Sequence, residues 1–402
     1  MSRGKRRYTF SCKISEKHSN SYSLLYFKNI ALIIKEKVEM KRFFACKTLG
    51  IDIICNVKYN FLYLYNTSGI GGVKKMTIKH VLVTGAAGYI GSVLTRQLLN
   101  KNYKVRGMDI LNFGGESLLG VYNHPNFEFF KGDIRIREDI EKAIDGIDAV
   151  IHLAAIVGDP ACAKDPETAE ETNWTAPKKI FDLCSSSNVK RFIFASTCSN
   201  YGKMEGEEYL NEDSPLRPVS LYAELKVKVE QYILNSDTKN GLSPTALRFA
   251  TAYGISPRMR FDLTVNEFTR DLACGKGLEI YGGQFWRPYC HIEDIAGACI
   301  LAMENTSEKA AHNVFGVGNT EENYQKKMLA DILVDVIPEA KGKIKFVHKD
   351  EDPRDYKVDF SKIKNELGFK TTRTVPESIR NIYNIVKQGF IKDPYSEKYR
   401  NI

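Results

Sequence analysis

Residues 81–91 read Val-Leu-Val-Thr-Gly-Ala-Ala-Gly-Tyr-Ile-Gly, and this stretch decides the fold of the chain. The apolar start predicts a buried strand, and residues 92–99 predict a helix with one apolar face. Between them, Gly85 allows a tight turn, Gly88 lets a ligand approach the backbone, and Gly91 lets helix and strand pack closely. The free N–H groups and positive dipole end of the helix suit a dinucleotide pyrophosphate.

Asp109 refines this prediction, because it lies 18 residues after Gly91 at the end of the second predicted strand. A carboxylate at that place accepts hydrogen bonds from a ribose and repels a 2′-phosphate. The sequence therefore predicts NAD as the cofactor.

Strands and helices alternate after Met76. This pattern predicts an α/β protein with a Rossmann-type, doubly wound parallel sheet. Beyond Gly254 the alternation weakens, which predicts a smaller C-terminal substrate-binding lobe. We expect an NAD-binding domain over 76–249 and the smaller lobe over 250–402. The predicted strands are 81–83, 103–108, 127–130, 149–153, 191–195 and 244–249, and a helix is predicted over 220–234.

The first 75 residues differ from the rest in charge. Residues 1–75 hold 15 basic and 4 acidic residues, whereas 76–402 hold 43 and 45. The body of the protein therefore offers no electrostatic argument for binding nucleic acid. A strand begins five residues after Met76. We expect Met76 to be the true start and residues 1–75 to be a wrongly assigned start or a disordered extension.

The nine cysteines include no C-x-x-C pair, so the sequence predicts free thiols, no metal site and a cytoplasmic protein. It holds no apolar run of about 18 residues, so we expect no membrane span.

Tyr222 and Lys226 lie four residues apart on a predicted helix, and therefore on one face of it. A nearby ammonium and a positively charged nicotinamide would favour the phenolate, which could then remove a hydroxyl proton. Thr197 ends a predicted strand, where its hydroxyl could hold the substrate oxygen. Tyr383 and Lys387 repeat the spacing, but the apolar residues of their helix indicate packing, and we predict a surface position.

Taken together, these motifs make residues from about 79 to 388 similar to the extended short-chain dehydrogenase/reductase family, the NAD-dependent epimerases and dehydratases of nucleotide sugars. The matching residues are Thr84-Gly-Ala-Ala-Gly-Tyr-Ile-Gly91, Asp109, Gly132-Asp133-Ile134, His152-Leu-Ala-Ala155, Asn173, Ser196-Thr197 with Tyr201-Gly202, Tyr222 with Lys226, and Arg287-Pro-Tyr-Cys-His291-Ile-Glu-Asp294.

The resemblance implies roles for individual residues and a homodimer. Thr197, Tyr222 and Lys226 would be catalytic. The nucleotide diphosphate would be held by arginines, whose forked guanidinium suits phosphate. The implied cofactor-binding residues are Gly85, Gly88, Tyr89, Ile90, Gly91, Asp109, Asp133, Ile134, Leu153, Ala154, Ala155, Tyr222 and Lys226. The implied substrate-binding residues are Asn173, Thr251, Arg287 and Arg354.

The chain also departs from the family. Cys198 and Ser199 stand where 4,6-dehydratases resembling it carry Asp-Glu, which argues against water elimination. Cys198 could exchange a proton in a 3- or 5-epimerisation, although a small buried residue is the favoured interpretation. Thr251 stands where galactose-type 4-epimerases usually carry Asn, which leaves the sugar open. Residues 256–262 and 353–356 resemble surface-polysaccharide enzymes, some of which oxidise or reduce C4 without inverting it.

The favoured function is an NAD-dependent nucleotide-sugar epimerase, similar to UDP-glucose 4-epimerase, that acts through a transient 4-keto sugar. The alternatives are a nucleotide-sugar 4-dehydrogenase or 4-ketoreductase and, less favoured, a dehydratase or an NAD-binding protein without turnover. The expected partner is a nucleotide-diphosphate sugar.

Overall fold

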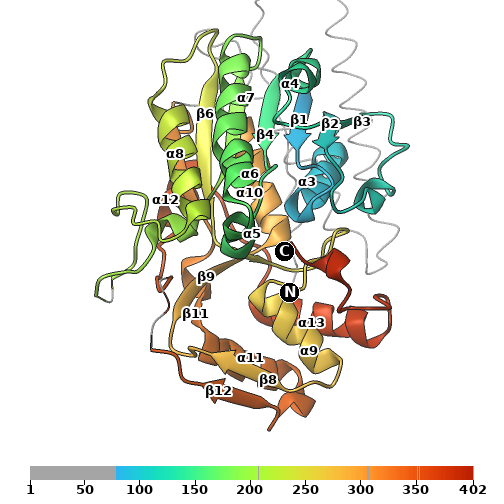
Figure 1. Ribbon diagram of the computed structural model, residues 1–402, viewed down its shortest axis with the longest axis vertical. Coiled ribbons are helices and arrows are strands. Elements are labelled where there is room, and N and C mark those ends of the chain that lie inside the picture. The colour runs from blue at the N-terminus through green and yellow to red at the C-terminus, as the bar shows by residue number, and fades with distance from the viewer. Residues whose placement is uncertain (1–77, 207, 306–307, 351, 353, 402) are drawn as a thin grey trace, which may run out of the picture. The chain divides into compact units, whose positions relative to one another are not determined.

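The computed structural model describes residues 78–401, except 207, 306–307, 351 and 353 (Figure 1). The basic extension 1–75 and the proposed start at Met76 lie outside the described residues. Residues Lys75–Ile402 form one compact unit.

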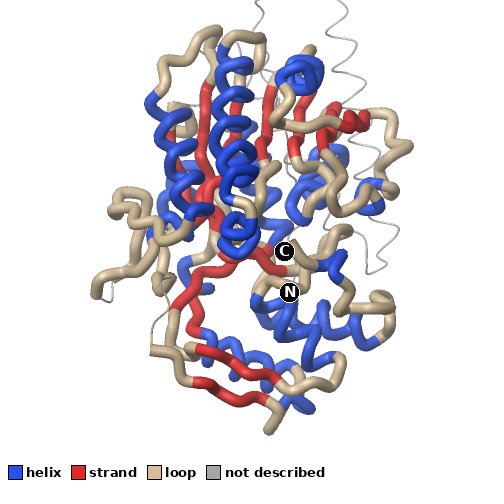
Figure 2. Tube along the Cα trace, viewed as in Figure 1, coloured by secondary structure: helices blue, strands red, loops and turns tan. Residues whose placement is uncertain are grey.

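A seven-stranded parallel sheet forms the centre of this unit (Figure 2), which confirms the Rossmann-type prediction. Each strand predicted from the sequence is present within a few residues of its expected bounds. In spatial order the strands are β10 (Asn313–Val317), β6 (Ser243–Phe249), β5 (Arg191–Thr197), β4 (Ala149–His152), β1 (His80–Thr84), β2 (Lys104–Asp109) and β3 (Phe127–Lys131).

Helices cover both faces of the sheet because its central strands are apolar on both sides. In β1, Val81 and Val83 join one hydrophobic cluster, and Leu82 joins the other. The first cluster includes residues of α3 (Tyr89–Asn100), α10 (Ile292–Glu304) and α12 (Ser361–Leu367). The second includes residues of α4 (Arg137–Ile144), α7 (Ala176–Ser185) and α8 (Leu221–Asn235).

The glycine turn joins β1 to α3 with very little space. Gly85 has φ +74°, which favours glycine. A Cβ on Gly91 would lie 2.0 Å from the Gly85 carbonyl oxygen, so a side chain there would collide with the turn. The first turn of α3 is thereby held directly against the end of β1.

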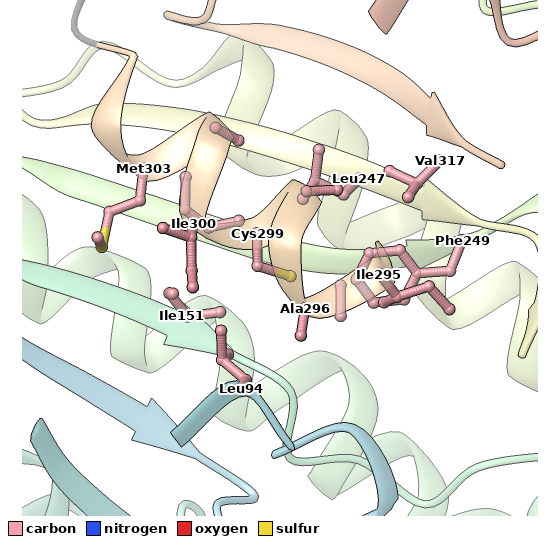
Figure 3. Packing of buried hydrophobic residues seen from close by; sticks show 14 of the residues in the cluster. Leu94, Ile151, Leu247, Phe249, Ile295, Ala296, Cys299, Ile300, Met303 and Val317 are labelled. Atoms are coloured by element: carbon pink, nitrogen blue, oxygen red, sulfur yellow. The ribbon is translucent and has the colours of Figure 1, made fainter. Parts of the chain in front are cut away.

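Helix α10 and strand β10 belong to the large sheet layer, although they lie within the segment expected to form the smaller lobe. Strand β10 pairs with β6 in parallel. On α10, Ile295, Cys299 and Ile300 join the cluster that includes Leu94 of α3 and Ile151 of β4 (Figure 3). Residues from the C-terminal part of the chain therefore complete the hydrophobic core that packs against α3 and β4, beside the glycine turn.

The remaining elements form a smaller layer beside the carboxyl ends of the large sheet. One sheet contains β7 (Thr251–Tyr253), β9 (Trp286–His291) and β11 (Asn323–Gln325), and β8 (Leu278–Tyr281) pairs with β12 (Ile344–Val347). Its helices are α9 (Thr264–Ala273), α11 (Lys326–Val336) and α13 (Val375–Lys387), while α5 (Asp159–Lys164) and α6 (Pro166–Glu170) follow β4. Within the part of the chain that the structure describes, no helix combines the length and apolarity needed to span a membrane.

Candidate active site

A cavity of about 640 Å³ lies where the carboxyl ends of the sheet strands meet the smaller layer. Such crevices are where open α/β sheets bind their ligands. Every residue predicted to bind cofactor or substrate, or to act in catalysis, lines this cavity, with Asn173 as the one exception.

Asn173 is buried in the π-helical turn Glu171–Thr175, away from the cavity. Its side-chain amide donates to the carbonyl of Ile156 at 2.8 Å, and its side-chain oxygen accepts from the Ile156 N–H at 2.9 Å. Ile156 itself lines the cavity. Asn173 therefore positions the loop after β4, and the structure gives it no direct place at the substrate.

At one end of the cavity, Asp109 closes the glycine turn. Its carboxylate accepts hydrogen bonds from the backbone N–H groups of Ala87 at 3.0 Å and Leu111 at 2.8 Å. Burial raises the pKa of Asp109, and these hydrogen bonds oppose that rise. Asp109 thus holds the turn in shape while it remains on the cavity wall, where the ribose was expected.

Asp133 lies on the same side of the cavity, after β3. Arg135 forms an ion pair with it at 2.6 Å, and its hydrogen bonds lower the pKa of the Asp133 carboxyl. Asp133 is therefore held as a carboxylate. We refer to the glycine turn with Asp109 and Asp133 as the cofactor end of the cavity.

Lys226 is buried in the middle of the cavity wall. Its ammonium donates to the Ala195 carbonyl at 2.9 Å and lies 5.8 Å from the centre of the Tyr222 ring. Burial lowers the pKa of Lys226 to about 8.

Tyr222 departs from the expected electrostatics. Burial raises its pKa above the ordinary value, and the nearby Cys162 adds to that rise. Arg260 lowers this pKa, but desolvation outweighs it, so the protein alone does not favour the phenolate that we expected. The remaining influence named in the prediction is the positive charge of the nicotinamide ring.

The segment after β5 separates Thr197 from its neighbour Cys198. Thr197 lines the cavity, and its hydroxyl oxygen accepts from the N–H of Ser199 at 3.1 Å. Cys198 is buried outside the lining, its thiol donates to the Arg248 carbonyl, and burial raises its pKa. This supports the interpretation of Cys198 as a packing residue. Ser199 does line the cavity, but it carries no carboxylate.

Basic and acidic side chains form the other end of the cavity, which we call the substrate end. Arg287 forms an ion pair with Asp352 at 2.9 Å, and Arg354 forms one with Asp159 at 3.1 Å. Lys326 lies 3.9 Å from the same Asp352 carboxylate. Both predicted arginines are therefore present, each already paired with a carboxylate.

Sequence reasoning missed several lining residues. Lys326 and Asp352 gave no signal, because only the fold of the smaller layer brings them beside Arg287. Arg258 and Arg260 also line the cavity. The sequence placed them in the stretch 256–262, which resembles surface-polysaccharide enzymes, but it assigned neither arginine a contact with a ligand.

The cofactor end fits a dinucleotide on its own geometry. The close packing at Gly85 and Gly91 exposes the start of α3 to the cavity, and Arg258 nearby has a buried Nε with no hydrogen-bond partner. Across residues 78–401 as described, no cluster of three or more His, Cys, Asp or Glu residues is placed to hold a metal ion.

The family model described as "NAD dependent epimerase/dehydratase family" matches residues 81–318, more than half of the chain. The chain therefore belongs to this family, as the resemblance predicted. The family is NAD-dependent.

Two curated relatives have different reactions in their names. The chain is 30% identical to a dTDP-glucose 4,6-dehydratase of Streptomyces griseus, over 72% of this chain and 88% of the relative. It is 28% identical to a UDP-glucose 4-epimerase of Lactobacillus helveticus, over 72% and 91%. A solved UDP-glucose 4-epimerase of Thermotoga maritima with UDP-glucose is 26% identical, with TM-score 0.69 and coverage of 77% and 99%.

Proposed function

We propose that this protein is an NAD-dependent nucleotide-sugar epimerase that acts through a transient 4-keto sugar. The observation that carries the proposal is that Thr197, Tyr222 and Lys226 line the same cavity as the glycine turn. A proton-transfer group, a hydroxyl-holding group and a dinucleotide turn are the parts that this chemistry needs.

The glycine turn with Asp109 would hold NAD, which when bound would supply the hydride acceptor and donor for C4 of the sugar. Tyr222 takes the proton of the C4 hydroxyl, and Thr197 holds that oxygen in place. Lys226, with its pKa lowered to about 8, can exchange a proton near neutral pH. The 4-keto sugar would turn in the cavity before Tyr222 returns the proton to its oxygen, so that the other face of C4 is reduced and C4 is inverted.

Dehydration is disfavoured by the groups after Thr197. Elimination of water needs an acid and a base beside the sugar. Here Cys198 is buried with a raised pKa, and Ser199 is a hydroxyl. The dehydratase relative therefore supports the fold and the cofactor, and the site chemistry supports epimerisation.

The substrate end supports a nucleotide-diphosphate sugar as the substrate. Arg287, Lys326 and Arg354 converge there, and guanidinium and ammonium groups are the usual partners of phosphate. On binding, the diphosphate would replace Asp352 and Asp159 as the partner of these cations.

Two further expectations belong to the proposal: a cytoplasmic location and a homodimer. The six cysteines in the described ranges are all free, which supports a reducing compartment. Light scattering coupled to size exclusion measures the oligomeric state.

The decisive experiment incubates the protein with a panel of UDP-, GDP-, CDP- and dTDP-sugars without added cofactor. An epimer that forms with no net change in nicotinamide absorbance supports the proposal. A keto sugar that accumulates, or a stoichiometric demand for cofactor, supports a 4-dehydrogenase or 4-ketoreductase instead. If NAD is bound and no sugar reacts, the enzymatic proposal fails.

A further inference from the structure

The loop after β7 is fastened to the first turn of α3. The Tyr89 hydroxyl donates to the Gly254 carbonyl at 2.6 Å, and the Ser256 hydroxyl donates to the Tyr89 carbonyl at 2.7 Å. Tyr89 lines the cavity, and so do Arg258 and Arg260 of the loop that follows Ser256. Arg258 is carried by this loop, two residues after Ser256.

The Arg258 side chain is only 6% exposed, yet its charge has no carboxylate partner. Its Nη2 donates to the carbonyl of Arg400 at 2.9 Å, and its guanidinium carbon lies 4.2 Å from the centre of the Phe113 ring. Its Nε has no hydrogen-bond partner, and no ion pair involves it in the described part of the chain. Arg260, two residues on, forms a two-pronged ion pair with Asp262.

Asp262 and Asp109 favour the charged form of Arg258 from a distance, but neither forms an ion pair with it. A buried guanidinium that lacks a direct ion-pair partner is energetically unfavourable. Burial, followed by the nearby charge of Arg260, lowers the pKa of Arg258 to about 10. Arg258 lies beside the start of α3, where the helix dipole also favours negative charge. An anion bound in the cavity would therefore be a suitable partner for its guanidinium.

We propose that Arg258 binds the pyrophosphate of NAD, and that the C-terminal tail of the chain holds it in position. This inference rests on the cofactor site proposed above and goes beyond it, because it concerns cofactor retention whatever sugar is used. A forked guanidinium matches phosphate oxygens in shape and charge.

The tail is the segment 397–401, which begins with the helical turn Glu397–Tyr399. The Phe261 N–H donates to the Tyr399 carbonyl at 2.8 Å, and the two rings pack edge to face at 5.6 Å. The Asn401 N–H donates to Asp262 at 3.3 Å, and Asn401 itself lines the cavity. The segment 397–401 thus contacts the same loop that α3 holds through Tyr89.

The test measures binding of NAD, ADP and adenosine by calorimetry to the full chain after removal of bound nucleotide. In Arg258→Ala, NAD and ADP should bind about 10- to 100-fold more weakly, the usual effect of losing a charged hydrogen bond. Adenosine, which has no phosphate, should bind as in the wild type. Arg258→Lys should recover part of the loss.

Arg270→Ala is the matched control. Arg270 is equally buried and donates to the Phe261 carbonyl of the same loop, but it does not line the cavity. It should keep NAD binding within about twofold, since no ligand contact is removed. Tyr399→Ala should weaken NAD binding less than Arg258→Ala, because it loosens the support and keeps the charge.

Each contrary result has a clear meaning. Unchanged NAD affinity in both Arg258 variants would overturn the inference while leaving the proposed function intact. An equal loss for adenosine and ADP would assign Arg258 to structure only. If the wild-type protein binds no NAD, the proposed function fails instead. Should Arg258→Ala not fold, Arg258→Lys with the three ligands decides.

Discussion

The two ends of the cavity are built in different ways. The cofactor end is made mainly of backbone, packed so closely that a Cβ at Gly91 would lie 2.0 Å from a carbonyl oxygen. The substrate end is made of long side chains, in which Arg287 and Arg354 already form ion pairs with Asp352 and Asp159. The first end needs no rearrangement to receive an anion, whereas the second must exchange partners.

This difference bears on the proposed epimerase reaction. A cofactor that stays bound through many cycles suits a rigid, preformed site, because preorganisation lowers the cost of binding. A substrate that must leave after each cycle is better held by arginines that can form ion pairs with carboxylates of the protein again when it leaves. We call the part of the cavity lined by Tyr222 the junction, and we expect the largest effect there and smaller effects at each end.

The largest effect is expected at the junction, where Tyr222 lies. Tyr222→Phe should lower kcat by about 10²- to 10⁴-fold, because it removes the proposed proton acceptor and little else. NAD content and thermal stability should stay near those of the wild type. Turnover of the sugar identified by the panel, measured with the nucleotide content of the same preparation, checks this.

Tyr383→Phe is the control for this prediction. Tyr383 and Lys387 share the Tyr-x-x-x-Lys spacing, but Tyr383 bonds to Glu339 outside the cavity. This variant should keep full activity. Full activity in Tyr222→Phe would instead refute every enzymatic reading of the site.

The next effect concerns the rigidity of the cofactor end. Gly91→Ala should lower the free energy of unfolding by about 2–3 kcal/mol, through overpacking against the Gly85 carbonyl, and should weaken NAD binding. Gly297→Ala on α10 is its counterpart, because an added Cβ there meets nothing within 4 Å. That variant should gain about 0.5–1 kcal/mol. Denaturant unfolding compares the two, and equal responses would contradict a tightly packed turn.

The substrate end should respond separately. In Arg287→Ala, the dissociation constant for UDP or another matching nucleotide diphosphate should rise about 10- to 100-fold, because a charged hydrogen bond is lost. NAD binding should not change. Arg373→Ala removes an exposed arginine paired with Glu293 and Glu377, and it should affect neither ligand. If Arg287→Ala also released NAD, the two ends would not be independent.

The smallest effect is a pH dependence caused by Lys226. Burial lowers its folded-state pKa from the ordinary 10.5 to about 8, so between these values the unfolded chain binds more protons. The free energy of unfolding should therefore rise by about 2 kcal/mol between pH ~8 and ~10. Lys226→Met should lack this rise. Parallel pH profiles in the two proteins would show that another group causes it.

The sequence predicted what depends on residues close together in the chain. The glycine turn, the position of Asp109 and the spacing of Tyr222 and Lys226 each occupy a single strand–turn–helix unit or helix face. All of these residues line the cavity. The return of α10 and β10 to the large sheet was not predicted, because their short apolar segments carry no mark of which layer they join.

Other features depend on contacts between distant segments. Nothing in the local sequence links Asp352 to Arg287, or Arg400 to Arg258. The raised pKa of Tyr222 likewise follows from burial, which the Tyr-x-x-x-Lys pattern does not show. Asn173 matched the family pattern, yet its side-chain amide is hydrogen-bonded to Ile156 and Cys162.

The path of the chain limits how the cavity can open. The polypeptide passes from β6 into β7, returns from β9 into α10, and leaves the large sheet again after β10. Lys203 and Leu210 form further bridges to Asp355 and Val358. Because the chain crosses between the two layers several times and backbone bridges add to these connections, separating the layers as rigid bodies would break backbone pairing. Ligands of the cavity, including the proposed nucleotide sugar, should then enter and leave by local rearrangement of the side chains at its mouth.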